Sequence, residues 1–261
     1  MNLIPIIYEN EEIIVINKAA GMPVQGGEKI VHSLDRELSV QMGYKIYLVH
    51  RLDKDTSGLM IVAKSSAAAN KWIKLISSHQ VKKEYKAVCI GKPKSSSGKI
   101  KENIEEFGVK KFAVTEYRLE KSFFVSPKKK PADSSDSVDS VDSVENVSGK
   151  PLEKNQKIAA QSEKSGVLQN GEKIELSLVH LKLETGRMHQ IRIHLAKSGC
   201  PIAGDDKHGN FRLNKVLRKI AGVKSLLLCS FRLVLPLDEG KREFEIDLPS
   251  HIKKVLDCSE N

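Results

Sequence analysis

Residues 46–63 read IYLVHRLDKDTSGLMIVA and place a highly charged turn between two short apolar runs. The runs, 46–49 and 59–63, are rich in aliphatic and β-branched side chains, which predicts two neighbouring strands. The turn holds side chains suited to chemistry: Arg51, Asp53, Asp55 and Thr56. Because rigid strand ends would fix these groups, Asp53 is a candidate for catalysis. The alternative is a plain hairpin loop, in which an Asp caps backbone N–H groups and Gly58 supplies a left-handed turn.

The composition favours one domain and a polyanionic partner. A chain of 261 residues can bury one good core. It carries 43 Lys and Arg against 33 Asp and Glu, for a net charge of +10 and a pI near 9.3. Such an excess favours nucleic acid as the partner, although a generally lysine-rich protein would show the same excess.

The cysteines and the N-terminal sequence indicate in which cellular compartment the protein is expected. Cys89, Cys200, Cys229 and Cys258 lie far apart and form no C-x-x-C pair, so we expect buried free thiols and neither a zinc site nor a disulfide framework. The N-terminus lacks the layout of a secretion signal, and no apolar run approaches the ~20 residues that cross a bilayer. We therefore expect a cytoplasmic protein without a membrane partner.

The chain alternates short strands with few helices. Strand-like runs are expected at 12–17, 47–50, 59–63, 85–90, 113–119, 174–183, 226–235 and 244–247. Helices are expected at about 66–78 and at 189–197, where Gly199 closes the second one. Because few helices have the length of a parallel crossover, the predicted fold class is α+β, with a mixed, largely antiparallel sheet flanked by helices.

The sequence predicts both the N-terminal cap and the buried face of the helix at 66–78. Ser65 or Ser66 can cap its first turn. A buried stripe is expected at helical spacing: Ala69, Trp72, Ile73 and Ile76. Trp72 is therefore interpreted as a core residue and not as a platform for a nucleic-acid base.

Residues 126–170 differ in kind from their surroundings. They contain Ser-Val-Asp repeats and no aromatic, Cys or His residue. Such a segment cannot bury enough apolar surface to offset its ordering entropy. We expect a single domain over 1–261 with a disordered insertion at about 126–170, between a strand that ends near Val125 and one that begins near Ile174.

Four motifs in order connect the chain to a known family. They are His50–Met60, Lys83–Val88 (KEYKAV), Leu183–Leu195 (LETGRMHQIRIHL) and Gly199–Asp205 (GCPIAGD). Together they resemble the RluA family of RNA pseudouridine synthases, over most of 6–125 and 172–255. The stretch GMPVQGG at 21–27 is most similar to the RluC-like enzymes of large-subunit (23S) ribosomal RNA. The resemblance implies the pseudouridine synthase catalytic fold and a cofactor-free isomerase that binds RNA, with transfer RNA as an alternative substrate.

The resemblance also implies site residues. Asp53 corresponds to the family's essential aspartate, either as a nucleophile or as a base. Arg192 corresponds to the arginine that faces it, with Arg187 as the fallback. Tyr85 corresponds to the tyrosine that stacks on the uracil, and Leu228 to the apolar wall of its pocket. Arg51 corresponds to the arginine that replaces the flipped nucleotide or contacts RNA nearby. Three further residues could add positive charge around the opening and so help to bind RNA: His50, Lys54 and Lys64.

The histidines near these motifs could suggest a metal-binding site, but their spacing argues against one. His189 and His194 are five residues apart, so they diverge from the shared helix face of an H-E-x-x-H motif. No Cys or acidic cluster completes a ligand set. We therefore expect no metal.

The chain departs from the family in three places. It begins almost at the first catalytic strand, so we expect no N-terminal S4-like RNA-binding module, whether lost, split off or outside the sequence. Cys229 stands where relatives have His, and His208 where they often have Tyr. These departures keep a catalytically silent RNA-binding or ribosome-assembly protein as a further alternative, and nothing suggests more than a monomer.

Overall fold

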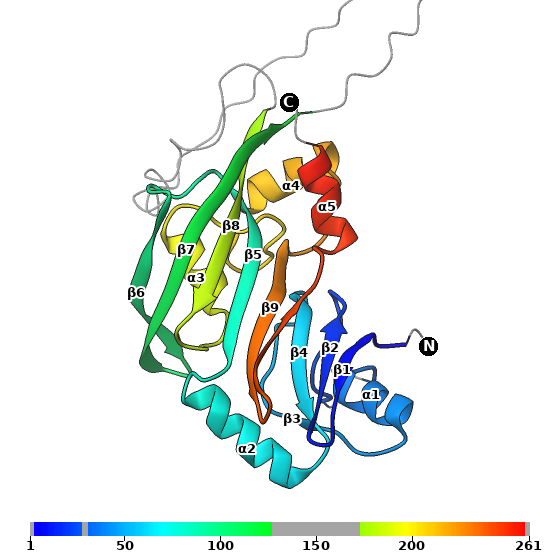
Figure 1. The fold of residues 1–261 in the computed structure, drawn as a ribbon. Coiled ribbons are helices and arrows are strands. Elements are labelled where there is room, and N and C mark those ends of the chain that lie inside the picture. Colours follow the sequence, from blue (N-terminus) through cyan, green and yellow to red (C-terminus); the bar gives the residue numbers. More distant parts are fainter. Residues whose placement is uncertain (1–2, 28–30, 127–172, 259–261) are drawn as a thin grey trace, which may run out of the picture.

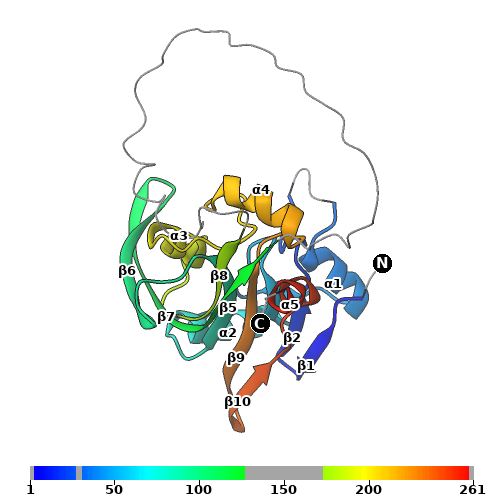
Figure 2. The same cartoon turned by 90° about the horizontal axis from the view of Figure 1, so that it is seen from above.

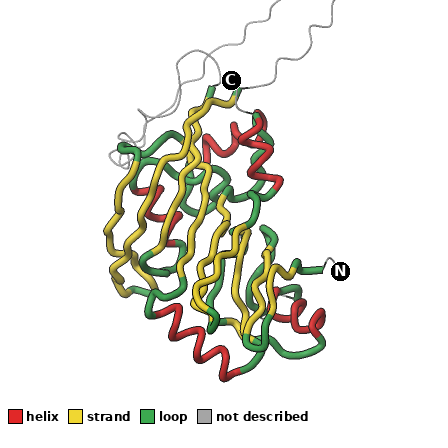
Figure 3. Tube along the Cα trace, viewed as in Figure 1, coloured by secondary structure: helices red, strands yellow, loops and turns green. Residues whose placement is uncertain are grey.

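The computed structural model describes residues 3–27, 31–126 and 173–258. These residues form ten strands and five helices (Figures 1 and 3). The strands are β1 (Ile6–Glu9), β2 (Ile13–Lys18), β3 (Tyr47–Leu48), β4 (Ser57–Ala63), β5 (Lys82–Ile90), β6 (Ser97–Glu106), β7 (Val109–Val125), β8 (Ile174–Leu183), β9 (Leu228–Leu237) and β10 (Gly240–Glu245). The helices are α1 (Leu34–Met42), α2 (Ser66–Ser77), α3 (Gln190–Lys197), α4 (Phe211–Ile220) and α5 (Ser250–Asp257).

All ten strands belong to one sheet. Its main order is β1-β2-β4-β9-β5-β8-β7-β6, while β3 pairs with β4 and β10 pairs with β9. Among the described strands, β4 and β9 form the one parallel pair, and every other pairing is antiparallel. The predicted α+β class with a mixed, largely antiparallel sheet is confirmed.

The central strands are buried on both faces. Because successive side chains of a strand point to opposite faces, β4 divides its residues between two apolar clusters. Leu59 and Ile61 pack with Trp72 of α2 on one face. Met60 and Val62 belong to the larger cluster on the other face, which also holds buried residues of α1, α3, α4 and α5. Figure 2 shows α1, α3 and α4 along the same side of the sheet.

Several elements were not predicted, for identifiable reasons. The helices α1, α4 and α5 are short and polar, and each buries only two residues or fewer. The strand β6 carries many charged residues, because it is an edge strand that exposes one face. Its partner β7 is much longer than the expected 113–119, because it pairs with β6 along one half and with β8 along the other.

The predicted helix at 66–78 is present, with one error in its buried face. The Ser65 hydroxyl caps it by accepting a hydrogen bond from the Ala68 N–H. Trp72 is buried, and its indole N–H donates to Glu12, which confirms the core reading. Ile73, however, is 43% exposed, because the buried stripe runs through Ala68, Ala69 and Trp72 instead.

The predicted insertion lies almost entirely outside the described residues. Val125 at the end of β7 pairs with Ile174 at the start of β8, so the chain leaves and re-enters the sheet at adjacent positions. The insertion therefore interrupts a β-hairpin, as the sequence indicated.

The cysteine prediction is largely confirmed. Cys89, Cys200 and Cys229 are buried free thiols, and Cys258 is a half-buried one. No helix in the described part of the chain combines the length and the apolar character that a membrane span needs.

Candidate active site

The loop that carries Asp53 connects β3 to β4 and is anchored by the buried side chain of Lys18. The Lys18 ammonium, fully buried at the end of β2, donates to the carbonyl oxygens of Ala19, Met22 and Lys54 at 2.8–2.9 Å. The Gly21 N–H donates to the same Lys54 carbonyl. Because Lys54 follows Asp53 directly, these bonds fix the loop on the rigid end of the sheet.

Arg192 lies against the Asp53 carboxylate. Its Nη1 donates to Asp53 Oδ2 at 3.3 Å, although the two residues are 139 positions apart in the chain. The arginine side chain is 4% exposed and the aspartate side chain 24% exposed. The contact therefore lies at the boundary between the protein interior and solvent.

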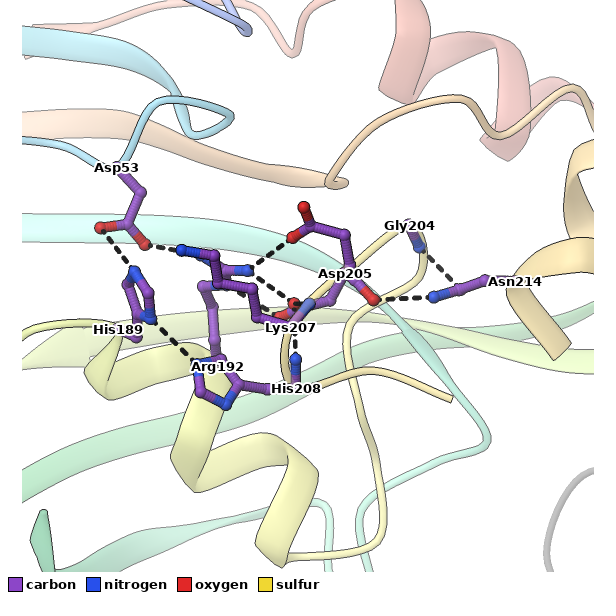
Figure 4. A network of polar contacts seen from close by, with 9 residues as sticks. Asp53, His189, Arg192, Gly204, Asp205, Lys207, His208 and Asn214 are labelled. Atoms are coloured by element: carbon purple, nitrogen blue, oxygen red, sulfur yellow. Dashed lines mark hydrogen bonds and ion pairs between the residues drawn. The ribbon is translucent and has the colours of Figure 1, made fainter. Parts of the chain in front are cut away.

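A second carboxylate fixes the guanidinium. Asp205 accepts from Arg192 Nε at 2.9 Å and from Nη2 at 2.6 Å, which is the bidentate geometry of a strong Arg–carboxylate pair. Burial alone would lower the pKa of Arg192, but the hydrogen bonds and charge of Asp205 raise it above its ordinary value. The exposed Asp206 also accepts from Nη2, at 3.1 Å. Figure 4 shows this network.

The loop of Asp205 is itself bonded to the backbone and to α4. Asp205 Oδ1 accepts from the N–H groups of Lys207 and His208, both at 2.9 Å. Burial would raise the pKa of Asp205, but these bonds and Arg192 keep it below its usual value. The Asn214 amide accepts from the Gly204 N–H and donates to the Asp205 carbonyl. The carboxylate that orients Arg192 therefore has little freedom to move.

Two histidines that contact each other lie next to the Asp53–Arg192 pair. His189 Nε2 lies 3.8 Å from Asp53 Oδ1, and its Nδ1 lies 2.9 Å from His208 Nε2 (Figure 4). Burial lowers the pKa of His189 and of His208, which favours the neutral form of both rings. Two neutral imidazoles joined in this way share one N–H between them.

The predicted site residues all line one cavity of about 480 Å³. All of the residues singled out from the sequence line it: His50, Arg51, Asp53, Tyr85, Arg187, Arg192 and Leu228. They come from the Asp53 loop, from β5, from the segment before α3, from α3 and from β9. The fold thus brings together residues of three of the four motifs and Leu228, which lie up to 178 positions apart in the sequence, from His50 to Leu228.

Tyr85 and Leu228 form the buried wall of the cavity. They are 5% and 3% exposed and belong to the adjacent strands β5 and β9. Burial raises the pKa of the Tyr85 phenol well above its ordinary value, and the nearby Asp53 charge adds to this effect. The Tyr85 hydroxyl therefore stays protonated at neutral pH.

His50 lines the cavity but does not carry positive charge. Its Nε2 accepts a hydrogen bond from the Ile61 N–H at 3.0 Å. Burial, helped by the nearby Lys83, lowers the pKa of His50 to about 3. The expected contribution of positive charge from His50 is therefore wrong. Lys64, also considered for such a role, pairs with Glu9 outside the cavity. Arg51 is exposed at the rim.

Arg187 does not replace Arg192 as the partner of Asp53. Its Nε donates to the carbonyl of Phe112 at 3.3 Å. The turn that carries it is fixed by the buried Gln190, whose Oε1 accepts from the Arg187 N–H and from the Thr185 hydroxyl. The Gln190 amide in turn donates to Val114 and Thr115 of β7.

The described residues hold no group of three or more His, Cys, Asp and Glu side chains placed to bind a metal. His194 points away from His189 and contacts the Thr115 hydroxyl through Nδ1. The divergence expected from the five-residue spacing is present.

Residues 12–197 match the profile of a family described as RNA pseudouridylate synthase. The chain belongs to this family. Its members are isomerases that convert uridine to pseudouridine. The resemblance found in the motifs is thereby confirmed.

Curated members of the family are similar over most of the chain. The ribosomal large subunit pseudouridine synthase C of Rickettsia bellii is 33% identical, over 96% of this chain and 70% of the relative. That of Rickettsia conorii is 36% identical, over 78% of this chain but only 56% of the relative. The tRNA pseudouridine synthase C of Yersinia pestis is 32% identical, over 89% of this chain and 81% of the relative.

Solved pseudouridylate synthase structures share the fold. Human RNA pseudouridylate synthase domain containing 4 superposes with a TM-score of 0.64 at 23% identity, covering 97% of this chain and 92% of that chain. Human RNA pseudouridylate synthase domain containing 1 gives a TM-score of 0.62 at 21% identity, covering 94% and 83%.

Sequence reasoning missed the supporting residues of this pseudouridylate synthase site. Asp205, His189 and Gln190 all lie inside motifs that were recognised, but no role was assigned to them. Lys18 and Asn214 carry no signal at all, because a single lysine or asparagine in a polar segment is ordinary. Their importance appears only when the backbone groups that they contact are known.

Proposed function

We propose that this protein isomerises specific uridines to pseudouridine in large-subunit ribosomal RNA. The observation that carries the proposal is the contact of Asp53 with a buried, immobilised Arg192 at the wall of a cavity lined by Tyr85 and Leu228. The family and the names of the Rickettsia relatives support it.

The reaction exchanges one glycosidic bond for another. The bond from ribose C1′ to N1 breaks, the uracil turns, and C1′ bonds to C5. C5 loses a proton and N1 gains one, so no oxidation state changes, no phosphate moves, and no cofactor is required. Asp53 is the catalytic carboxylate, because one of its oxygens faces Arg192 and its side chain remains partly open to the cavity. Arg192 balances its charge and fixes its orientation.

The cavity suits a detached base. Its volume of about 480 Å³ lies within the range of small-molecule sites, so uracil can turn in it without leaving. Tyr85 offers a flat surface for stacking and a protonated hydroxyl that donates a hydrogen bond. Leu228 closes the apolar side.

Uridine in folded RNA reaches such a cavity only after it is flipped out, which costs a few kcal/mol. Cations at the opening can offset this cost by binding phosphates. Arg51, Lys83 and Arg187 all line the cavity. Lys83 has no carboxylate within ion-pair distance in the described part of the chain, and burial lowers its pKa.

Transfer RNA is the second candidate substrate. The observation in its favour is the Yersinia pestis relative, which this chain matches over 81% of that protein's own length, more than for the Rickettsia relatives. Cytoplasmic location and a monomeric state stay predictions, as does the single domain.

The test is conversion of uridine in ribosomal and transfer RNA prepared separately. Carbodiimide adducts of pseudouridine stop reverse transcription, so each new stop marks a modified position. We expect stops with the wild-type protein on ribosomal RNA and none with Asp53→Asn. Asp55→Asn is the matched control, because this neighbouring carboxylate does not line the cavity.

Other outcomes have definite meanings. Stops on transfer RNA alone would replace the substrate proposal by the second candidate. RNA binding without stops would support a catalytically silent RNA-binding protein and overturn the enzyme proposal. Equal stops from wild type and Asp53→Asn would remove Asp53 from the mechanism.

A further inference from the structure

A second hollow of about 420 Å³ lies between the end of α3 and the start of α4. Its lining combines apolar groups from Ile90, Pro201 and Leu213 with Phe211 and Arg212, the first two residues of α4. None of these five residues lines the Asp53 cavity. The volume is again in the range of sites for small ligands.

Phe211 is unusually placed for an aromatic residue. It is 63% exposed, although it begins a helix whose other apolar residues are partly or fully buried. The helix start is otherwise well made, since the Asn210 side chain accepts from the Leu213 N–H. An exposed ring on a well-capped helix beside a hollow offers a stacking surface.

The face of α4 that continues from Phe211 is strongly cationic. Its exposed charged residues are all basic: Arg212, Lys215, Arg218 and Lys219. The ten residues of α4 contain no Asp or Glu, and none of these four cations forms an ion pair with the described residues. On α2 and α5, by contrast, Lys71 and Lys253 pair with acidic neighbours.

Residues at the hollow are hydrogen-bonded to residues of the active site. His208 lines it and is hydrogen-bonded to His189, which lies against Asp53. Asn214 of α4 holds the backbone on both sides of Asp205, which orients Arg192. α4 therefore has a fixed position relative to the catalytic pair, on the same side of the sheet as α3 (Figure 2).

We propose that the hollow binds a second, unpaired base of the RNA substrate, stacked on Phe211, while the α4 cations contact the adjoining phosphates. A π-face next to a row of unpaired cations matches the alternating chemistry of single-stranded RNA. This inference rests on the proposed function and adds an RNA contact outside the cavity in which the uridine reacts.

The stacking contact is tested with Phe211→Ala. Affinity for a fluorescently labelled oligouridylate is measured over a range of salt concentrations. We expect binding to weaken by about 5-fold to 100-fold at every salt concentration, with an unchanged salt dependence, because stacking involves no counterion. Phe107→Ala is the matched control, since that ring is 93% exposed in the β6–β7 turn, and it should bind as the wild type does.

The phosphate contacts are tested with the double variant Lys215→Gln/Lys219→Gln. Its log–log salt slope should fall by about 0.7 for each phosphate contact that is lost. The double variant Lys253→Gln/Lys254→Gln on α5 removes the same charge elsewhere and should keep more of the wild-type slope.

Measurements of RNA modification rates distinguish a failure of this inference from a failure of the proposed function. In RNA modification assays the α4 variants should raise KM and leave kcat unchanged. If the wild type modifies RNA but Phe211→Ala binds within twofold of it, or the two double variants give equal slopes, the second site is wrong while the proposed function stands. A wild type without activity would overturn the proposed function itself.

Discussion

At the residue scale, the site depends on one arginine held by carboxylates of very different exposure. Asp205 is 1% exposed and Asp206 is 70% exposed, yet both accept hydrogen bonds from Arg192 Nη2. A buried charge that loses its buried partner is strongly destabilised, whereas an exposed ion pair contributes little. The two neighbouring aspartates therefore offer a matched comparison.

We expect Asp205→Asn to lower the free energy of unfolding by about 3–5 kcal/mol, because Arg192 would keep its charge without its buried counter-ion. Displacement of the guanidinium from Asp53 should also reduce kcat by about 100-fold. Asp206→Asn should change stability by less than about 0.5 kcal/mol. Denaturant unfolding and RNA modification rates measure both. Equal effects of the two substitutions would show that burial does not decide the strength of these contacts.

A second residue-scale prediction concerns His50 and acid. Its pKa is about 3 in the folded protein and is ordinary, about 6.5, in the unfolded chain. The unfolded chain therefore binds the proton first as pH falls. The stability that His50 contributes is complete above pH 6.5 and is lost as pH falls from 6.5 to 3, by up to about 1.4 kcal/mol per pH unit.

The matched variants are His50→Gln, which keeps an acceptor for the Ile61 N–H, and His32→Gln, whose side chain is 79% exposed in the wild type. Unfolding in urea at pH 7 and pH 5 should show a smaller loss of stability for His50→Gln than for the wild type. His32→Gln should behave as the wild type. A wild-type loss that His50→Gln leaves unchanged would contradict the assignment.

At the scale of elements, the parallel contact between β4 and β9 places the Asp53 loop beside Leu228. Gly58 makes this contact possible. Its φ is +111°, and a Cβ built on it would lie 2.2 Å from the Ser230 carbonyl oxygen. The sequence indicated a glycine for a left-handed turn, but Gly58 lies within β4 and is required mainly by the close approach of a neighbouring strand.

We expect Gly58→Ala to lower the free energy of unfolding by about 3 kcal/mol or more, since backbone strain and overlap with Ser230 add. Gly43→Ala is the control. Gly43 also has a positive φ, +75°, but nothing lies within 4 Å of its added Cβ, so only about 1–2 kcal/mol should be lost. Thermal unfolding of both variants gives the comparison. Similar losses would mean that strain alone explains Gly58.

At the scale of the whole molecule, one continuous sheet joins the N-terminal strands to the C-terminal ones. Both apolar clusters include residues of β2, β4 and β9. Neither cluster can therefore be exposed without disturbing the other. We expect the chain to unfold in a single cooperative step, with the far-UV and near-UV circular dichroism transitions coinciding in denaturant. Two separated transitions would contradict the prediction of a single domain.

How much the sequence predicted follows from how local each signal is. Short runs rich in aliphatic and β-branched residues located β2, β4, β5 and β8, and the helical stripe at 66–78 located Trp72. α4 and β6 were missed because they are amphipathic elements at the edge of the molecule, whose charged residues dominate their composition. All seven candidate site residues line one cavity because motif resemblance, and not periodicity, selected them.

From the amino-acid sequence alone came most of the central strands, the hairpin that the 126–170 segment interrupts, the family and the Asp53–Arg192 pair, whereas β1 and β6 were missed. Those features are encoded in short runs of residues, where apolar composition and motif order are visible without knowledge of the fold. The groups that support the pair could be identified only from the folded chain: Asp205, His189, Lys18 and Asn214. The neutral state of His50 likewise follows only from the folded chain, because charge and hydrogen bonding inside a protein depend on burial and on partners that are distant in the chain.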